Sequence, residues 1–362
     1  MVTINDVAKR AGVSISTVSN VLNKNKFVSG ALAQRVNTAV RELDYTANPI
    51  AQKMKIKHTK TIGVITADLC GLFYPYILKG MYDTFISRGY RLIVMDSGGV
   101  HDRIGSIKKL REGITSLIRD RVDGIAFSSM VPEELEAGVI DDVMKLSALK
   151  KHTGVVCVEK DLSGYGIDSV YVNSERGADI ATSHLIEVGC RHIGHIAGPG
   201  FLTVAQDRMA GYKNAMGRGG IAVNEARMIA HGDYSHKSGY LAMKELLHKM
   251  PDIDGVFVAN DQMSVGVLKA LSEEGKRIPE DIKVIGYDDV FVASVLEPSL
   301  STIHVQKYFM GEKAAELLIK QIENSEEHAK RDRGTAAEIE STLIVRRSTV
   351  KNAQEDWILV DW

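Results

Sequence analysis

The chain has 362 residues, and its 45 lysines and arginines nearly balance its 46 aspartates and glutamates, which leaves a formal net charge of −1 at pH 7. This length exceeds one ordinary domain and suits two or three, while 44% hydrophobic and 25% charged residues are typical of a soluble globular protein. No run of 18 apolar residues is present, which excludes a membrane-spanning helix.

The cysteines and the first residues indicate a cytoplasmic protein. Cys70, Cys157 and Cys190 are far apart and form no Cys-x-x-Cys pair, which fits a reducing compartment and argues against a structural zinc site. The opening residues, MVTINDVAKR, carry charge from the start and are not typical of a secretory signal. We therefore expect a cytoplasmic location and no metal.

The charge is distributed unevenly along the chain. Residues 1–60 hold ten Lys and Arg against three Asp and Glu, so the remainder is acidic. A basic head on an acidic body suggests that the head meets a polyanion. A basic, solvated arm would have the same composition, so the pattern inside the head has to decide between the two interpretations.

A helix-turn-helix pattern opens the head. Residues 3–6 fit an N-terminal capping box, and apolar residues then follow on one helical face (Ile4, Val7, Ala8 and Ala11). Gly12 is expected to end this helix in the left-handed conformation. Ser14 can cap a second helix, which Ile15 or Val18 would anchor to the core. Two short helices joined in this way are typical of DNA-binding proteins.

The second predicted helix is rich in side chains that can read DNA, because in this motif it lies in the major groove. Ser16 can bond to several bases, Asn20 can pair with adenine through two hydrogen bonds, and Ile15 can contact a thymine methyl group. Ser14, Thr17 and Ser19 suit phosphates. A polar helical hairpin on a larger core is the structural alternative.

The stretches TINDVAKRAGVS, STVSNVLN, ELDYTANPIAQKMK and TKTIGVI resemble the lactose-repressor/galactose-repressor family. The resemblance implies that residues 48–56 form a hinge helix on the operator, with Met54 where a leucine usually enters the minor groove. Asn20, where the family often has arginine, and the apolar Gly30–Ala33 depart from the family pattern. The candidate DNA-binding residues are Thr3, Ser14, Ile15, Ser16, Thr17, Ser19, Asn20, Asn23, Met54 and Lys55.

After a third helix, predicted over 31–43, and a linker, apolar strands alternate with helical patterns. The predicted strands are TIGVITAD, RLIVMDS, DGIAFSS, GVVCVEKD, SVYVNS, HIGHIAG, GVFVAND and KVIGYDD. The predicted helices cover about 74–88, 107–121, 178–188, 205–217 and 263–275. This alternation predicts doubly wound α/β lobes with parallel sheets. Residues 326–338 are charged and are expected to form an exposed loop.

Polar pairs directly follow several of these strands. They are Ala67–Asp68, Glu159–Lys160, Asn260–Asp261 and Tyr287–Asp288. Because ligands of such folds bind beyond the carboxyl ends of the strands, we expect these pairs to meet in one cleft.

The body also resembles the same family, through LFYPYILKGM, RVDGI, HLIEVGCRHIGHIAGP, QDRMAGY, VFVANDQMSVGVLKAL, IPEDIKVIGYDD and LSTIHV. The resemblance implies a two-lobed body like a periplasmic sugar-binding protein, with lobe crossings near residues 161, 291 and 323 and an effector in the cleft. The matching effector-binding candidates are Phe73, Tyr74, Glu159, Arg208, Tyr234, Asn260 and Asp288. Arg, Asn and Asp can share hydrogen bonds with the vicinal hydroxyls of a sugar. A ligand that leaves one of these buried polar side chains unpaired would bind much more weakly, which would make the cleft selective.

Each candidate has a structural alternative: the aromatics as core residues, Arg208 in an ion pair, and Asp288 as a turn cap. Glu159 stands where the family often has a shorter aspartate. The predicted organisation is a helix-turn-helix domain (1–47), a hinge (48–60), an effector-binding and dimerisation domain (61–349) and a tail (350–362). Lobe 1 would comprise about 61–161 and 292–322, and lobe 2 about 162–291 and 323–349.

Other motifs point to no further chemistry. His192-Ile-Gly-His195 spells a synthetase signature but falls in a predicted strand, where residues three apart point to opposite faces. GPGFL lacks the spacing of a dinucleotide site, and no nucleophile stands at a recognisable distance from a base. We therefore expect no cofactor and no enzymatic activity. The tail, with both tryptophans, could fold back, contact a partner or stay loose.

The sequence thus predicts a homodimeric transcriptional regulator, a repressor, that binds a pseudo-palindromic operator and responds to a small effector. A sugar or sugar derivative suits the cleft best. A nucleobase effector, or activation by a corepressor or protein partner, is the alternative. A solute-binding protein is the remoter one, and it would leave the basic head without a purpose.

Overall fold

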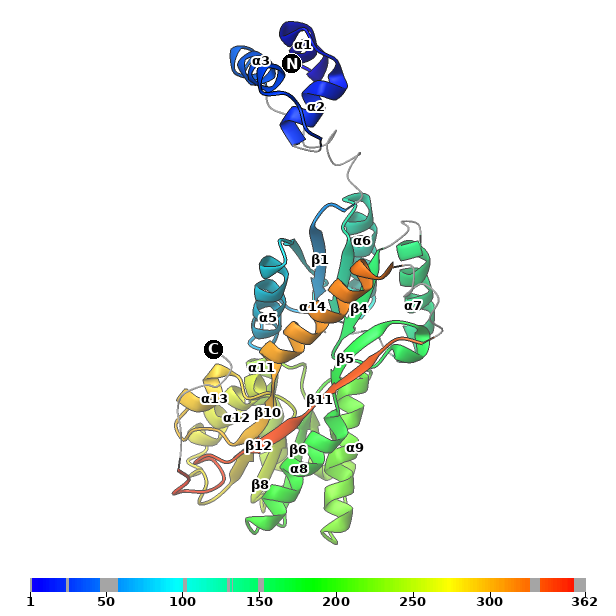
Figure 1. Cartoon of the computed structure of the whole chain (residues 1–362). Coiled ribbons are helices and arrows are strands. Elements are labelled where there is room, and N and C mark those ends of the chain that lie inside the picture. The colour runs from blue at the N-terminus through cyan, green and yellow to red at the C-terminus, as the bar shows by residue number, and fades with distance from the viewer. Residues whose placement is uncertain are drawn as a thin grey trace. The chain divides into compact units, whose positions relative to one another are not determined.

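The computed structural model describes residues 2–23, 26–45, 58–99, 103–128, 131, 133–148, 153–325 and 333–354 (Figure 1). It separates into two compact units, Met1–Thr59 and Lys60–Trp362. The predicted hinge helix, with Met54 and Lys55, and the end of the tail from residue 355 lie outside the described residues.

The described residues of the head form three helices, α1 (Ile4–Ala11), α2 (Ile15–Asn23) and α3 (Gly30–Glu42). The predicted capping box is present, because the Thr3 N–H donates to the Asp6 carboxylate over 2.8 Å. Gly12 follows α1 at φ 63°, the left-handed conformation that its missing Cβ permits. The predicted turn between the two helices is therefore confirmed.

A small apolar core holds the three helices together. Its buried members are Val7, Ala8, Ala11, Val18, Val36 and Ala39. Val18 is 0% exposed whereas Ile15 is 46% exposed, so Val18 is the residue that anchors α2. Ile15 is thereby left on the surface of the first turn of α2.

A long-range contact closes the end of α1. The Arg35 guanidinium of α3 donates from Nη2 to the carbonyl of Ala11 over 2.6 Å and to that of Gly12 over 3.2 Å. The last carbonyls of a helix have no partner within it, so Arg35 supplies one and adds a favourable charge at the negative end of the helix dipole.

Two parallel sheets are present in the described part of the larger unit. The first has the strand order β11-β5-β4-β3-β1-β2, and the second β7-β6-β8-β9. A separate antiparallel pair joins β10 to β12. The strands are β1 (Thr61–Thr66), β2 (Arg91–Asp96), β3 (Gly124–Ser128), β4 (Gly154–Val158), β5 (Asp168–Val172), β6 (Ile193–Ala197), β7 (Ile229–His231), β8 (Gly255–Val258), β9 (Lys283–Ile285), β10 (Thr302–Val305), β11 (Ala336–Ile339) and β12 (Ser341–Ile344).

Helices cover these sheets, and all five helices predicted for the body are present, so the two-lobed α/β fold is confirmed (Figure 1). The helices are α5 (Tyr74–Ser87), α6 (Arg103–Arg119), α7 (Glu133–Ala148), α8 (Ser174–Glu187), α9 (Thr203–Arg218), α10 (Glu225–Met228), α11 (His236–Lys249), α12 (Asp261–Glu273), α13 (Phe291–Val295) and α14 (Lys307–Glu323), with a short 3-10 turn at Ser163–Tyr165.

The central strands β1, β3 and β4 of the six-stranded sheet are buried on both faces. Along β1, Ile62 and Val64 join the core that includes α5 and α14, whereas Ile65 joins a second core formed with α6 and α7. Successive side chains of a strand point to opposite faces, so a strand covered on both sides is a continuous apolar run. All six residues of β1 are buried accordingly.

Strand pairing corrects the predicted lobe boundaries. β5 pairs with β4, and β11 pairs with β5, so both belong to the first lobe rather than the second. The chain therefore crosses between the lobes near residues 173, 306 and 340, and not near 161, 291 and 323. The end of the predicted loop 326–338 is part of β11. An apolar strand looks the same in either sheet, and its neighbours alone decide which sheet it joins.

The head offers a direct test of the turn at Gly12. Gly12→Ala should destabilise the head by about 1–2 kcal/mol, since an alanine in the left-handed conformation is strained, and the added Cβ would stand 2.6 Å from Arg35 Nη2. Amide hydrogen exchange of residues 4–22 in the full chain measures the loss of protection. Gly30→Ala is the control, because its added Cβ meets nothing within 4 Å. Equal protection in both variants would contradict the role given to Gly12.

Candidate functional site

The candidate DNA-reading residues lie on the surface of the head. Ser14, Ile15, Ser16 and Thr3 are exposed, while Thr17, Ser19 and Asn20 are half-buried. None of these side chains belongs to the apolar core of the head. The first turn of α2 therefore presents polar groups outward, as a helix that contacts base edges with its N-terminal residues requires. The Asn23 side chain lies outside the described residues.

Hydrogen bonds order the start of α2 without using up the hydrogen-bonding capacity of its hydroxyl groups. The Ser14 hydroxyl accepts from the Thr17 N–H over 3.1 Å, which makes Ser14 the N-cap. It also lies 2.7 Å from the Ser16 hydroxyl and 2.9 Å from that of Thr17. A hydroxyl has one donor and two acceptor sites, so these groups keep capacity for a further partner. The Thr3 hydroxyl donates to Asp6.

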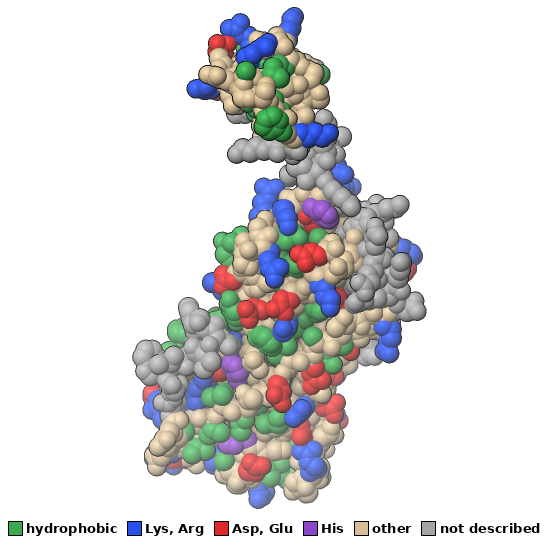
Figure 2. Space-filling model, in the orientation of Figure 1, with side chains coloured by type: hydrophobic (Ala, Val, Ile, Leu, Met, Phe, Trp, Pro, Cys, Tyr) green, Lys and Arg blue, Asp and Glu red, His purple; other side chains and the backbone are tan. Residues whose placement is uncertain are grey.

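The head also carries cationic side chains, which Figure 2 shows on its visible face. Arg10 forms an ion pair with Glu42 over 2.7 Å. The excess of lysine and arginine in this part of the chain suits a polyanionic partner such as the phosphate backbone of DNA.

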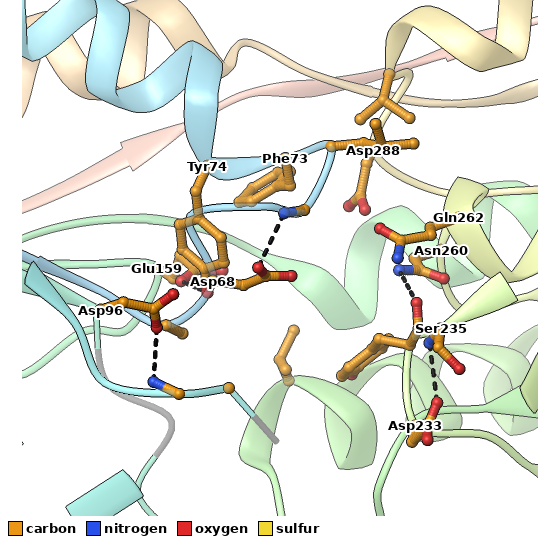
Figure 3. A pocket seen from close by; sticks show the side chains of 18 of the residues that line it. Asp68, Phe73, Tyr74, Asp96, Glu159, Asp233, Ser235, Asn260, Gln262 and Asp288 are labelled. Carbon is orange, nitrogen blue, oxygen red and sulfur yellow. Dashed lines mark hydrogen bonds between the residues drawn. The ribbon is translucent and has the colours of Figure 1, made fainter. Parts of the chain in front are cut away.

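In the body, a cavity of about 280 Å³ lies where the carboxyl ends of strands from both lobes meet (Figure 3). All seven candidate effector residues line it: Phe73, Tyr74, Glu159, Arg208, Tyr234, Asn260 and Asp288. Phe73 and Tyr74 start α5, and Glu159 follows β4. Asn260 and Asp288 follow β8 and β9 in the second lobe. The cavity therefore occupies the position where open α/β sheets bind ligands.

Three of these residues have backbone strain. Glu159, Tyr234 and Asp288 have φ angles of 80°, 69° and 105°, respectively. Non-glycine residues in such conformations cost of order 1–3 kcal/mol each and persist only where the surroundings enforce them. Strain gathered around one cavity indicates walls shaped for binding rather than for stability.

Glu159 and Tyr74 form a coupled pair in the wall from the first lobe. The Tyr74 hydroxyl donates to Glu159 Oε2 over 2.6 Å. Desolvation, with a smaller contribution from the nearby Asp288, raises the pKa of Glu159 to about 7 against the opposing effects of the Tyr74 hydrogen bond and Arg208. The pKa of Tyr74 is also raised, by burial first and then by Glu159.

Arg208 and Asp288 form the ion pair of the opposite wall. Arg208 is 7% exposed, and its Nη2 lies 3.4 Å from Asp288 Oδ1. Its Nη1 donates to the carbonyl of Ala259, and its guanidinium lies 3.8 Å above the Tyr287 ring. Desolvation raises the pKa of Asp288 to about 6, which Arg208 and Lys307 partly offset. The structural alternative for Arg208, an ion pair, thus coexists with its position in the cavity.

Further polar residues line the cavity, although they were not among the predicted effector residues. They are Asp68, Asp96, Asp233, Ser235 and Gln262. Asp68 and Asp96 come at the ends of β1 and β2, so the rule of strand ends could have added Asp96 to the expected cleft pair Ala67–Asp68. Asp233 and Ser235 are in a loop after the three-residue strand β7, which the sequence pattern missed.

The prediction that the four strand-end pairs meet in one cleft is only partly confirmed. Ala67, Asp68, Glu159, Asn260 and Asp288 line the cavity, but Lys160, Asp261 and Tyr287 do not. Lys160 pairs with Glu136, and Asp261 is fully buried, where it accepts from the Val290 N–H and the Thr302 hydroxyl. Only one member of each of the last three pairs therefore faces the cavity, whereas Ala67 and Asp68 both line it.

The two histidines of the His-Ile-Gly-His motif also lie apart. His195 is fully buried, with its ring stacked against Tyr212 and Phe257, and burial lowers its pKa to about 3. His192 is half-exposed and contacts Asp252 over 3.0 Å. Across the described ranges, no group of three or more His, Cys, Asp or Glu side chains could hold a metal ion. In the same ranges, no helix combines the length and the apolar character needed to span a bilayer.

Known proteins resemble both units. Residues 3–48 match the family model described as bacterial regulatory proteins, lacI family, and residues 182–349 match the periplasmic binding protein-like domain. The chain is 35% identical to the HTH-type transcriptional repressor PurR of Vibrio atlanticus over 354 residues, which is 97% of this chain and 99% of the relative. The chain belongs to the LacI family.

Other relatives of this LacI-family protein share both units. The Ribose operon repressor of Escherichia coli is 35% identical over 89% of this chain and 93% of its own length. The Lac repressor dimer bound to operator and the anti-inducer ONPF matches with a TM-score of 0.78 at 27% identity, over 96% of this chain and 99% of that one. The CelR–cellobiose complex matches with a TM-score of 0.68 at 29% identity, over 96% and 100%.

This LacI-family protein is therefore a sequence-specific DNA-binding transcriptional regulator of the repressor type with an effector-binding body. One chain carries both the DNA-binding head and the effector-binding body. The relatives that align over nearly their whole length share this arrangement.

Asn20 provides the test of the reading helix. Asn20→Ala should reduce discrimination at one base pair by about 1–3 kcal/mol, because a bidentate contact to adenine would be lost. Binding of the full chain to a set of duplexes with single base changes measures the effect. Asn37→Ala, an exposed asparagine on α3, is the control. If the base preference of the Asn20 variant matches that of the control, Asn20 does not read sequence.

Glu159 provides the test of the cavity electrostatics. An acid whose pKa is raised in the folded state binds its proton more tightly there than when unfolded, so its contribution to stability declines as pH rises from about 4.5 to about 7. Over this pH range, the free energy of unfolding of Glu159→Gln should therefore fall by roughly 1–3 kcal/mol less than that of wild type. Urea unfolding followed by circular dichroism, with the exposed Glu245→Gln as control, measures it. An identical pH dependence in wild type and Glu159→Gln would contradict the raised pKa.

Proposed function

We propose that this regulator acts in the cytoplasm as a homodimer that binds a pseudo-palindromic operator and is controlled by a sugar or sugar derivative in the cavity between the lobes. The observation that carries the proposal is that one chain joins an outward-facing polar helix start to a cavity lined from both lobes. The proposal involves no chemical step on the ligand.

The head would read DNA through the start of α2. Ser16 and Asn20 contact base edges, Ile15 contacts a thymine methyl group, and the remaining hydroxyls contact phosphates. Two heads of a dimer would engage half-sites one or more helical turns apart. From the sequence, Met54 and Lys55 add a minor-groove contact, with Met54 as an apolar wedge between base steps.

The cavity would hold a polyol by hydrogen bonds. Carboxylates such as Asp288 and amides such as those of Asn260 and Gln262 suit vicinal hydroxyl groups, and aromatic rings such as Phe73 suit the C–H face of a sugar. The Ribose operon repressor and the CelR–cellobiose complex support this ligand class. A nucleobase is the second candidate.

Control would follow from linkage. Because the cavity is lined from both lobes, a ligand contacts both and favours one arrangement of the lobes over others. If the arrangement that binds ligand differs in DNA affinity, ligand and operator change each other's affinity by the same factor. The sign, induction or corepression, follows from which arrangement the operator prefers.

Operator binding with titrated ligands tests the proposal. A duplex selected from a random pool by the full chain serves as operator, and fluorescence anisotropy reports its affinity with D-ribose, cellobiose or hypoxanthine present. We expect a sugar to shift the operator affinity by about 5–150-fold, the usual range of such coupling. The operator should shift the affinity for that sugar by the same factor.

The outcomes separate the parts of the proposal. A response to hypoxanthine alone would replace the sugar by a nucleobase. Ligand binding without any change in operator affinity would contradict the allosteric control. Failure to select any duplex, or an affinity for DNA that does not fall as salt rises, would contradict DNA binding through phosphate contacts.

A further inference from the structure

We propose that the cavity accepts a hydroxyl-rich ligand without negative charge and rejects the phosphate ester of the same compound. This inference rests on the proposed function of the same cavity and adds the charge class of its ligand. It also assigns the regulator a place in a reaction sequence, since a phosphoryl transfer onto the effector would end the signal. The regulator would respond to the compound that a kinase consumes.

The first observation is the charge of the cavity wall. Five carboxyl groups line it: Asp68, Asp96 and Glu159 from the first lobe, and Asp233 and Asp288 from the second (Figure 3). Among the described lining residues, Arg208 is the one lysine or arginine. A cleft lined by one sign of charge between low-dielectric walls concentrates the field inside it, so an anion entering this cavity is repelled.

The second observation is that Arg208 already has partners. Its Nη1 donates to the Ala259 carbonyl, its Nη2 faces Asp288, and its guanidinium covers the Tyr287 ring. The buried Nε of Arg208 has no hydrogen-bond partner. An anion that drew Nη2 away from Asp288 would leave a buried carboxylate with less compensation, which is costly. The guanidinium therefore balances part of the negative charge of the wall.

The third observation is that loop amides hold the carboxylates in place. Asp68 accepts from the N–H groups of Cys70 and Gly71 over 2.8 and 2.9 Å. Asp96 accepts from Leu69 and Gly98, and Asp233 accepts from Ser235. These side chains cannot turn away from an incoming anion without losing their backbone partners. Each carboxylate has about four lone-pair sites, which leaves acceptors for ligand hydroxyls.

The fourth observation concerns the helix starts at the cavity, where phosphates usually bind. Ser235 caps α11 by accepting from the Ser238 N–H, and Asn260 caps α12 by accepting from the Met263 N–H over 2.9 Å. Asp261, the first residue of α12, adds a buried carboxyl group behind that cap. These two helix starts are thus closed to a phosphate by their own side chains, whereas the starts of α5 and α9, which also border the cavity, have no side-chain cap.

One carboxyl group of the cavity already acts on another. The charge of the nearby Asp288 contributes to raising the pKa of Glu159, after the larger effect of desolvation. The groups that face Glu159 are Tyr74, Asp288 and Arg208, and those that face Asp288 are Arg208 and Lys307. A ligand phosphate would add a charge of nearly two to the same space, against the same desolvation.

The experiment compares matched pairs by isothermal titration calorimetry with the full chain. The pairs are D-ribose and D-ribose 5-phosphate, D-glucose and D-glucose 6-phosphate, and D-fructose and D-fructose 6-phosphate. For the pair whose sugar binds, we expect the ester to bind at least about 100-fold more weakly. Raising NaCl from about 0.05 to about 0.5 M should narrow this gap, because salt screens charge and not shape.

A charge variant separates electrostatic from steric exclusion. In Asp96→Asn/Asp233→Asn, the ratio of ester affinity to sugar affinity should rise at least about tenfold, because two of the repelling charges are gone. Glu245→Gln is the control, since it removes a carboxylate that pairs with Lys249 away from the cavity, and its ratio should equal that of wild type. The ratio, rather than either affinity, is the measured quantity.

Each result has one meaning. An ester that binds as tightly as its sugar, or more tightly, overturns the inference and leaves a sugar-responsive regulator standing. The inference is also overturned if the difference in affinity between sugar and ester changes neither with salt nor in Asp96→Asn/Asp233→Asn, because exclusion of the ester would then be steric. If no sugar and no ester binds while hypoxanthine does, the proposed sugar effector fails and this inference fails with it.

Discussion

The geometry of parallel sheets is the constraint on which the site depends. All strands of such a sheet end at the same edge, so the loops that follow them converge. In this chain the edges of two sheets face one cavity, and Asp68, Glu159, Asn260 and Asp288 come from four different strand ends. No two of them are close in sequence across the lobes. Their proximity follows from the common edge at which parallel strands end, and a ligand that touches both edges would contact both lobes.

The convergence of these loops buries carboxyl groups, which is unfavourable, and neighbouring groups in the cavity offset part of this effect. Burial raises the pKa of Glu159 to about 7, with a smaller contribution from Asp288, and burial also raises the pKa of Asp288 to about 6. The Arg208 guanidinium, the Tyr74 hydroxyl and the backbone amides of the loops offset part of this cost. The strained φ angles of Glu159, Tyr234 and Asp288 add to it. A wall kept at this cost favours partners that supply hydrogen-bond donors and disfavours further negative charge.

Sequence reasoning succeeded where the interactions are local or belong to a recognisable motif. All seven residues assigned to the cavity by family resemblance line it, and the helix-turn-helix has its cap, turn and core as expected. It failed for Lys160, Asp261 and Tyr287, because a rule about strand ends does not say to which side each neighbour points. It also overlooked Asp233, since β7 has three residues and too short a pattern to recognise.

The sequence by itself determined the local architecture: the capping of α1 by Thr3 and Asp6, the turn at Gly12 and the two-sided burial of β1. These depend on residues within a few positions of one another, or on periodicity that any window of sequence contains. Only the tertiary structure decided that β5 and β11 join the first lobe. It also decided that Arg35 caps α1 and that Arg208 forms an ion pair with Asp288. The physical reason is that such pairings are set by which distant segments pack together, and equivalent apolar strands or arginines carry no local mark of their partner.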